Sequence, residues 1–491
     1  MIDEQLSVLA VVAPLLAAPL CVLMPRARWS WLLALVASVA CFAISVRLFV
    51  LVQSDGMIVT PLGGWAAPWG IEYRVDPVNS LVMLIVSGIS SVCLLSARLS
   101  INKEIDSSRQ PLFYTAWLLC LSGLIGMTVT GDAFNLFVFL EISSLSSYVL
   151  IAMGRDRRAL TASFQYLVMG TIGATFIIIG VGFLYLATGS LNMADIAVRL
   201  PDTIATRTME SALAFLTVGM GLKIAMFPLH LWLPNAYAYA PSVVSAFIAA
   251  TATKVALYAL IRFLFTIFGY QFSFVEMPLS AILAVLAVAA VLVASTVAIF
   301  ERDIKRMLAY SSVAQIGYML LGIAIASQAG VTASIAHIFN HALMKGALFL
   351  ALACVVYQIG SVMRDDLTGL SRRMPWTFGA FTIASLSLIG MPLTAGFTSK
   401  WLLVQAALAA GWWMIALLVL IGSLLAVVYI WRVIEIMIRP PAENAPRQEA
   451  PLSLLAPAWI LALANIYFGI FTGINIGSAK AAAIWLLGGV S

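Results

Sequence analysis

The sequence predicts an all-α polytopic membrane protein with about fourteen transmembrane helices. Of its 491 residues, 63% are hydrophobic and 10% are charged, a ratio of about 6 to 1 where soluble domains lie near 2 to 1. Apolar runs of about 20 residues, each about 30 Å long as a helix, recur from end to end. This composition excludes a soluble enzyme, a secreted scaffold and a nucleic-acid binder, because none of them can bury so much apolar surface.

The apolar runs follow one another with connections too short to hold a soluble domain. The first run is a span rather than a signal peptide, because the residues before it, Met1-Ile2-Asp3-Glu4, are acidic where a signal sequence is basic. The expected spans are 5–24, 29–52, 77–97, 112–130, 134–153, 162–187, 211–233, 242–268, 277–300, 307–326, 331–357, 376–409, 411–438 and 452–473.

Basic residues divide unevenly between alternate loops. Numbered from the N-terminus, the odd loops hold 17: Arg26, Arg28, Arg98, Lys103, Arg109, Arg155, Arg157, Arg158, Arg302, Lys305, Arg306, Arg364, Arg372, Arg373, Arg432, Arg439 and Arg447. The even loops hold four: Arg74, Arg199, Arg207 and Arg262. Lys and Arg gather in the cytoplasmic loops of membrane proteins. We therefore expect the odd loops in the cytoplasm and both termini outside, and this bias also explains the net charge of +6.

Charged side chains inside apolar sequence mark the functional part of the chain. Four of the seven lysines lie well inside expected spans, namely Lys223, Lys254, Lys345 and Lys400. Glu141 is the acidic residue at comparable depth. A charge at the bilayer centre costs about 2.5–3.5 kcal/mol on insertion scales, and such groups usually pair or face water. We therefore predict that these five residues form an ion or proton path.

The three histidines extend this pattern, because all of them lie away from surface loops. His337, His341 and Lys345 are spaced at i, i+4 and i+8, so they follow one slowly turning helix face with about 6 Å of rise per step. Water can bridge titratable groups at this spacing. His230 follows Lys223 by seven residues, which predicts that both lie on one helix face two turns apart.

We expect no metal site, disulfide or cofactor. A metal bound by His337 and His341 would need a third ligand, and the residues between them lack the Glu of a zincin helix. The five cysteines fall inside apolar runs and form no C-x-x-C pair, which argues against a disulfide, a zinc site or an iron–sulfur cluster. They are Cys21, Cys41, Cys93, Cys120 and Cys354.

Two expected spans are broken at matching places. Pro228 follows Lys223 and frees the carbonyl of Ile224, while Pro392 precedes Lys400 and frees the carbonyl of Leu388. Irregular backbone at membrane depth is tolerated where it is buried or meets a wet cavity, and paired broken helices are typical of transporter repeats. The two broken spans, the seventh and the twelfth, are five apart, so the repeats would be inverted.

The breaks divide the chain into four parts. These are 1–110 (spans 1–3), 111–270 (first five-helix repeat, spans 4–8), 271–438 (second repeat, spans 9–13) and 439–491 (a polar loop, span 14 and a short tail). Any one of the buried polar residues could serve only as a contact between helices. Their joint occurrence with two matched breaks favours transport over a structural scaffold.

Several stretches resemble the antiporter-like subunits shared by Mrp-type multisubunit cation/proton antiporters and respiratory complex I. The resemblance covers about spans 3 to 13. Residues 131–141 (GDAFNLFVFLE) resemble the fifth-helix motif with its functional glutamate. The other matching stretches are 221–223 (GLK) with 227–234 (FPLHLWLP) and 238–241 (AYAP), 253–258 (TKVALY), and 337–350 (HIFNHALMKGALFL).

Lys400 distinguishes the members of this family. Residues 390–400 (GMPLTAGFTSK) carry lysine where the M-type subunit of complex I is expected to carry glutamate. The L-type subunit ends in a long lateral helix, whereas about 18 residues follow the last expected span here. The D-type Mrp subunit and the N-type complex I subunit remain, and the stretch at 131–138 looks closer to the D type.

The resemblance implies a secondary transporter subunit that works with other subunits in the inner membrane of a bacterium. It implies a switchable ion pair of Glu141 and Lys223, a relay through Lys254, His337, His341 and Lys345, and exchange with one membrane face at Lys400; Asp132 and His230 would support it. The transported ions would be protons and a monovalent cation, with Na+ expected. The alternative is a subunit of a redox-driven pump, complex I or a membrane hydrogenase, which would count as a translocase subunit with its redox centre in another subunit.

Overall fold

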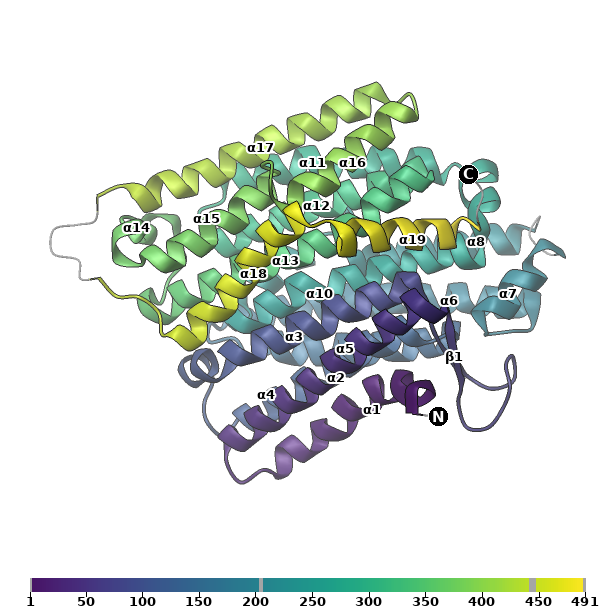
Figure 1. Ribbon diagram of the computed structural model, residues 1–491, viewed down its shortest axis with the longest axis horizontal. Coiled ribbons are helices and arrows are strands. Elements are labelled where there is room, and N and C mark those ends of the chain that lie inside the picture. The colour runs from purple at the N-terminus through teal and green to yellow at the C-terminus, as the bar shows by residue number, and fades with distance from the viewer. Residues whose placement is uncertain (1, 203–205, 441–446, 489–491) are drawn as a thin grey trace.

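The computed structural model describes residues 2–202, 206–440 and 447–488, and these are almost entirely helical (Figure 1). The elements are α1 (Ile2–Leu23), α2 (Ala27–Asp55), β1 (Ile58–Pro61), β2 (Glu72–Val75), α3 (Pro77–Glu104), α4 (Gln110–Val129), α5 (Ala133–Ala152), α6 (Arg158–Thr188), α7 (Met193–Arg199), η1 (Leu200–Asp202), α8 (Arg207–Ile224), α9 (Trp232–Tyr239), α10 (Ser242–Ile261), η2 (Arg262–Ile267), η3 (Gln271–Glu276), α11 (Leu279–Phe300), α12 (Ile304–Ile325), α13 (Gln328–Ile359), η4 (Arg364–Leu367), α14 (Leu370–Arg373), α15 (Pro375–Ile389), α16 (Ala395–Ala409), α17 (Trp413–Ile438), α18 (Leu452–Ile470), η5 (Gly473–Gly477) and α19 (Ser478–Leu486).

Within the described residues, 12 helices are long and apolar enough to cross a membrane. They coincide with twelve of the expected spans, which confirms an all-helical polytopic membrane protein. The other two expected spans, 211–233 and 376–409, are each divided into two shorter helices, α8 with α9 and α15 with α16. The total of fourteen spans and the inverted repeat stay predictions.

The last expected span differs from the structure. The helix α18 ends at Ile470, three residues before the expected end, and the chain continues through η5 into α19. Figure 1 shows α18 and α19 following one another across the molecule. The expected short tail is therefore largely helical, because Ala479, Ala482 and Ala483 are small enough to let α19 pack closely against α13 and α3.

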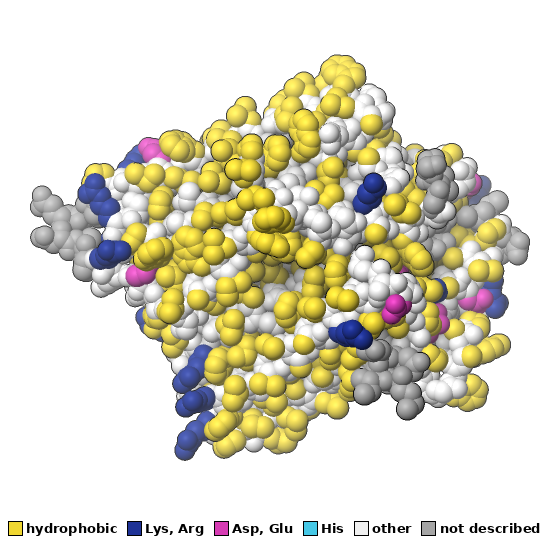
Figure 2. All heavy atoms as spheres, viewed as in Figure 1, with side chains coloured by type: hydrophobic (Ala, Val, Ile, Leu, Met, Phe, Trp, Pro, Cys, Tyr) yellow, Lys and Arg dark blue, Asp and Glu magenta, His cyan; other side chains and the backbone are white. Residues whose placement is uncertain are grey.

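The loops alternate between the two ends of the helices. At one end Asn192, in the sixth loop, donates to Glu72, in the second, over 2.9 Å. At the other end Lys103, in the third loop, donates to the carbonyl of Tyr357, beside the eleventh, over 2.8 Å. We call this second end, which holds the odd loops, the basic end; dark blue side chains gather there in Figure 2, opposite the antiparallel hairpin of β1 and β2.

The helix α13 forms the centre of the molecule. It packs against α3, α10, α12, α15, α16, α18 and α19. From Gly330 to Val355 every residue except Leu343 is buried, because other helices pack around α13. The polar side chains of α13 are consequently surrounded by other helices and shielded from lipid. By contrast α2, α6 and α17 expose many large apolar side chains at the periphery.

Candidate proton path

The helices α5 and α8 bring Glu141 and Lys223 together. The Lys223 Nζ atom donates to Glu141 Oε1 over 3.2 Å and to Ser144 Oγ over 2.9 Å. Glu141 and Ser144 are three residues apart on α5, so they lie on one face of that helix. Lys223 is 5% exposed, whereas the Glu141 side chain is 23% exposed. The carboxylate therefore stands at the surface of the chain and the ammonium group in its interior.

A small cavity connects Lys223 with α10. Its volume is about 20 Å³, and it is lined by Lys223, Ser144 and, from α10, Ala252 and Ala256. A cavity of this size holds about one water molecule. One water there extends the hydrogen-bonding reach of Lys223 to α10, on the face of that helix opposite Lys254, since Ala252 and Ala256 lie two residues before and after this lysine.

The first helix break lies where Pro228 predicts it. The helix α8 ends at Ile224, and the next residue, Ala225, has a left-handed backbone with φ of 61°. Left-handed residues commonly terminate helices. The carbonyl of Leu222 in the last turn accepts a hydrogen bond of 3.0 Å from the indole of Trp232 at the start of α9. This bond holds α9 against the broken end, next to Lys223.

The predicted position of His230 is wrong. Lys223 and His230 do not share a helix face, because the helix ends between them and His230 lies in the connection before α9. Its ring stacks on Phe227 with centroids 5.2 Å apart and faces Tyr310 edge-on. Asp132 lies outside the charged cluster as well: it caps α5 by accepting from the backbone N–H of Asn135 over 2.7 Å.

The second break, between α15 and α16, is occupied by Lys400. The Nζ atom of Lys400 donates to the carbonyls of Leu388, over 2.9 Å, and Ile389, over 3.0 Å. The sequence predicts that Pro392 frees the first of these carbonyls, and the structure shows Lys400 satisfying it. The ammonium group also lies 4.9 Å from the centre of the Tyr318 ring. A cation is favourable both at a helix C-terminus and over an aromatic face.

The two histidines of α13 stack along the helix as their spacing predicts. The rings of His337 and His341 are nearly parallel, with centroids 6.0 Å apart. His337 Nε2 lies 2.8 Å from Gln315 Oε1, and Nδ1 lies 2.8 Å from Ser399 Oγ. Because Ser399 precedes Lys400, His337 connects α13 with the second break. Both ring nitrogens of His341 are buried and have no hydrogen-bond partner among the described residues. Either nitrogen is therefore open to proton transfer.

Lys254 and Lys345 are fully buried. Lys345 donates to the Leu308 carbonyl over 2.7 Å and to Ser311 Oγ over 2.5 Å. Lys254 donates to Thr253 Oγ1 over 3.3 Å and to a backbone carbonyl of α10. Among the described residues neither lysine has an acidic partner, and the same holds for Lys400. An uncompensated buried charge is unfavourable, so these amines cannot all carry a proton at once.

The buried groups are close enough to influence one another. His341 interacts electrostatically with His337, Lys254, Lys345 and Lys400. Adding a proton to one of these groups therefore disfavours a proton on its neighbours. This mutual dependence is what a chain of proton transfers requires.

Sequence reasoning missed the neutral partners of the charged residues. Single serines and glutamines are common in membrane helices, so nothing in their own sequence context singled them out. The one available signal was position, since Ser144 and Ser399 lie within three residues of Glu141 and Lys400. The missed residues are Ser144, Ser311, Gln315, Tyr318 and Ser399.

Comparison with known proteins places this geometry in a family. The chain is 42% identical over 424 residues to the N-type NADH-quinone oxidoreductase subunit of Desulforudis audaxviator, covering 84% of each. It is 33% identical over 371 residues to the D-type Na(+)/H(+) antiporter subunit of Alkalihalophilus pseudofirmus, covering 76% of this chain and 74% of the relative.

Solved structures agree with these relatives. A chain of the Mrp complex from Dietzia sp. superimposes with a TM-score of 0.90 at 26% identity, covering 99% of this chain and 98% of that one. A chain of the membrane-bound sulfane sulfur reductase, an archaeal respiratory membrane complex, gives 0.91 at 30% identity, covering 98% of each. The family described as NADH:quinone oxidoreductase/Mrp antiporter, TM matches residues 130–426, and with these relatives it shows that the chain belongs to the NADH:quinone oxidoreductase/Mrp antiporter family of membrane subunits.

Proposed function

We propose that this chain is the proton-translocating subunit of a multisubunit monovalent cation/proton antiporter, with Na+ as the exchanged cation. The observation that supports this most is the contact of Lys223 with Glu141 and Ser144 beside a broken helix. This acid–base pair stands at the head of a row of buried amines that lack acidic partners among the described residues. The remaining subunits of the antiporter are its partners, and the chain is a transporter subunit rather than a self-contained enzyme.

The proton moves when the ion pair opens. While Glu141 is ionised and close, it compensates the charge on Lys223. When Glu141 takes up a proton or moves away, the Lys223 ammonium group is left buried without a counter-ion, which is unfavourable. Lys223 then gives its proton, through water, to the neutral amine of Lys254 on the neighbouring helix α10, which becomes the charged member.

The same exchange continues along the centre of the molecule. Lys254 passes the proton toward His341, whose ring nitrogens make no hydrogen bond within the described part of the chain. From there it reaches Lys345 on one side or His337, Ser399 and Lys400 on the other. At each step one group loses the proton that the next gains, so the row holds a constant charge. Export of the cation is coupled to this row through neighbouring subunits of the complex.

The orientation and division of the chain belong to the proposal. The excess of Lys and Arg at the basic end supports a cytoplasmic location of that end in a bacterium, with both termini outside. An inverted repeat of 111–270 and 271–438, flanked by 1–110 and 439–491, is supported by the two breaks. Both α8 and α15 end in a left-handed residue, Ala225 and Gly390, and they run in opposite directions. Lys223 precedes its break and Lys400 follows its break, so the repeat is not exact.

A second candidate is the membrane subunit of a redox-driven proton pump. The observation in its favour is the 42% identity to a relative named as an NADH-quinone oxidoreductase subunit. The buried relay would then be the same, and the energy would come from a redox reaction in another subunit. The two candidates differ in what the proton movement is coupled to: exchange for Na+ in the first and electron transfer in the second.

The ion pair provides the test of the proposed function. Glu141→Ala and Lys223→Ala, expressed with the partner subunits in a host without sodium extruders, are expected to abolish Na+-driven proton movement in inverted membrane vesicles. The complex should still assemble, since the spans keep their apolar length. The matched control is Glu435→Ala, which removes an exposed carboxylate paired with Arg439. Near-normal transport by either relay variant contradicts the proposal, and proton movement driven by electron transfer but not by Na+ favours the second candidate.

A further inference from the structure

A buried lysine, Lys305, and a half-buried glutamate, Glu104, lie at the basic end, outside the path described above. Lys305, in the first turn of α12, is only 4% exposed although its sequence context places it in a loop. Its Nζ atom donates to Ser242 Oγ over 3.2 Å and weakly to the Ala240 carbonyl over 3.4 Å. Ser242 in turn donates to Glu104 Oε2, over 2.9 Å from its backbone N–H and 3.3 Å from its hydroxyl.

One hydroxyl group therefore separates the ammonium group from the carboxylate. Glu104 is held in place by Ser100, whose hydroxyl donates to Oε1 over 2.6 Å. The residues come from three helices, α3, α10 and α12, that meet at the basic end. A purely structural ion pair would gain most from direct contact, and here the Ser242 hydroxyl lies between the two charges instead.

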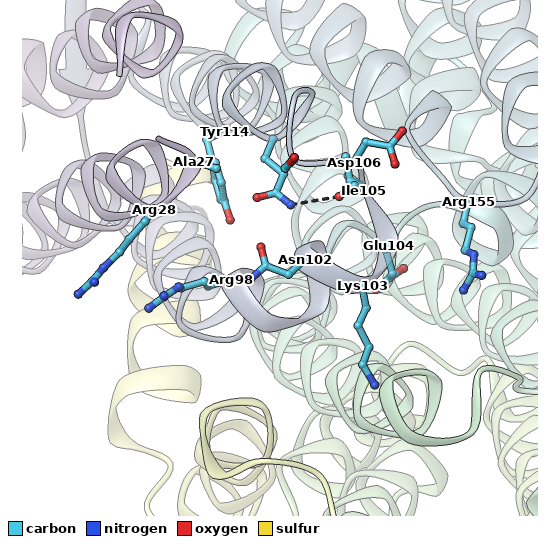
Figure 3. A pocket seen from close by; sticks show the side chains of 12 residues that line it. Ala27, Arg28, Arg98, Asn102, Lys103, Glu104, Ile105, Asp106, Tyr114 and Arg155 are labelled. Carbon is cyan, nitrogen blue, oxygen red and sulfur yellow. Dashed lines mark hydrogen bonds between the residues drawn. The ribbon is translucent and has the colours of Figure 1, made fainter. Parts of the chain in front are cut away.

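Water reaches this cluster from the basic end. Glu104 lines two cavities of about 710 and 720 Å³, and Lys305 lines the second. Figure 3 shows the first cavity, with Arg28 and Arg98 on one side of Glu104 and Arg155 on the other. Both cavities are lined largely by charged and polar groups and are large enough for many water molecules. The carboxylate and the ammonium group thus border bulk-like water on their outer side.

The inner side of the cluster leads to Lys345. That lysine donates to the Leu308 carbonyl and to Ser311 Oγ, both on α12. Leu308 is three residues beyond Lys305 and Ser311 is six beyond, which is about 4.5 and 9 Å along the helix axis. The partners of Lys345 are consequently one and nearly two turns deeper than Lys305. A single helix carries the route from the water-filled cavity to the buried row of amines.

The cluster also uses the same residue types as the pair on α5 and α8. In both places a lysine contacts a serine hydroxyl and is compensated by a glutamate: Lys223 with Ser144 and Glu141, and Lys305 with Ser242 and Glu104. Lys305 interacts electrostatically with Glu104 and with Asp303. Burial disfavours the charge on Lys305, and these two carboxylates offset part of that cost; the amine also lines the second cavity, where it can exchange a proton with water.

We propose that Glu104, Ser242 and Lys305 form the gate through which protons pass between water at the basic end and the row of buried amines at Lys345. This inference rests on the proposed function. In the inward direction the Lys305 ammonium group loses a proton, through the Ser311 hydroxyl or water, to the neutral amine of Lys345. The neutral Lys305 amine then takes a proton from a hydronium ion in the cavity, and Glu104 stabilises the restored charge; the outward direction reverses both transfers.

The first experiment removes the amine. Lys305→Ala, in the assembled complex in inverted vesicles, is expected to slow Na+/H+ antiport on the order of 100-fold, the range found for loss of a proton-transfer group. The matched control is Lys103→Ala: Lys103 lines both cavities and its ammonium group contacts the Tyr357 carbonyl and ring, so the charge change is the same but the route is intact. Antiport by the Lys305→Arg variant should be as slow as that of Lys305→Ala, because guanidinium does not release its proton.

The second experiment restores the charge at Glu104. The five native cysteines are buried, so Glu104→Cys can be modified selectively by charged methanethiosulfonate reagents. A sulfonate reagent applied to the basic end should recover antiport, whereas a trimethylammonium reagent should not. The gate is disproved if the two reagents have equal effects. It is also disproved if Lys305→Ala shows normal antiport while Lys223→Ala is inactive. Neither result contradicts the proposed function. Normal antiport by Lys223→Ala overturns the proposed function itself.

Discussion

Replacement of Lys400 by methionine separates a transport role from a structural one. The methionine side chain is unbranched like that of lysine and one atom shorter, so it keeps most of the packing beside Tyr318 but removes two hydrogen bonds to the C-terminal carbonyls of α15. Leaving both carbonyls without a donor costs about 1–3 kcal/mol each. Removing a charge from the membrane interior stabilises the folded complex by about 2.5–3.5 kcal/mol. The two effects nearly cancel, so the folded complex should remain stable within a few kcal/mol.

For transport, by contrast, no gain offsets the loss of the Lys400 amine. Lys400 is the titratable group that follows His337 and Ser399, and methionine cannot carry a proton. We expect Lys400→Met to abolish salt resistance and Na+-driven proton movement in vesicles, while the purified complex elutes at its normal size and unfolds within a few degrees of the unmodified complex. Lys400→Glu should retain part of the activity at a different working pH, since a carboxylate also titrates.

The matched control is Lys480→Met, which removes an exposed lysine from α19. It should leave both transport and stability unchanged. The reasoning is refuted if Lys400→Met transports normally, because Lys400 then only caps the broken helix. It is also refuted in its energetic part if the complex fails to assemble with methionine, because the carbonyl contacts would then outweigh the cost of the buried charge.

Three further perturbations test separate parts of the structure. Ser144→Ala should slow antiport several-fold without abolishing it, since Lys223 loses one acceptor worth about 1 kcal/mol but keeps Glu141; unchanged kinetics would remove Ser144 from the path. Gly390→Ala should lower the unfolding temperature of the complex, because φ is +95° there and an added Cβ would lie 3.1 Å from Lys400, a strain of about 1–3 kcal/mol; an unchanged unfolding temperature would disprove this. Arg157→Cys should react with impermeant reagents only from the cytoplasm, and labelling from outside in intact cells would overturn the orientation.

The charged path was predictable because apolar sequence makes charge conspicuous. Within a span of some 20 apolar residues a single lysine or glutamate stands out, and its cost in a membrane argues for a function. Helical spacing was enough to place His337 and His341 in register, since both belong to one uninterrupted helix. The same rule failed for His230, because Pro228 ends the helix and with it the periodicity on which the prediction depends.

The sequence by itself determined the helical membrane fold, the alternation of the loops, the two breaks and the identity of the buried charges, because each of these depends on composition or on spacing along the chain. Only the tertiary structure decided which neutral groups meet those charges. Gln315 and Ser399 reach His337 from α12 and α16, separated from it by 22 and 62 residues. Lys305 shows the limit most clearly: it reads as a loop residue among other basic residues, and it is buried only because three helix ends converge on it. The burial of Lys305 is a property of the packed helices, and its local sequence does not encode it.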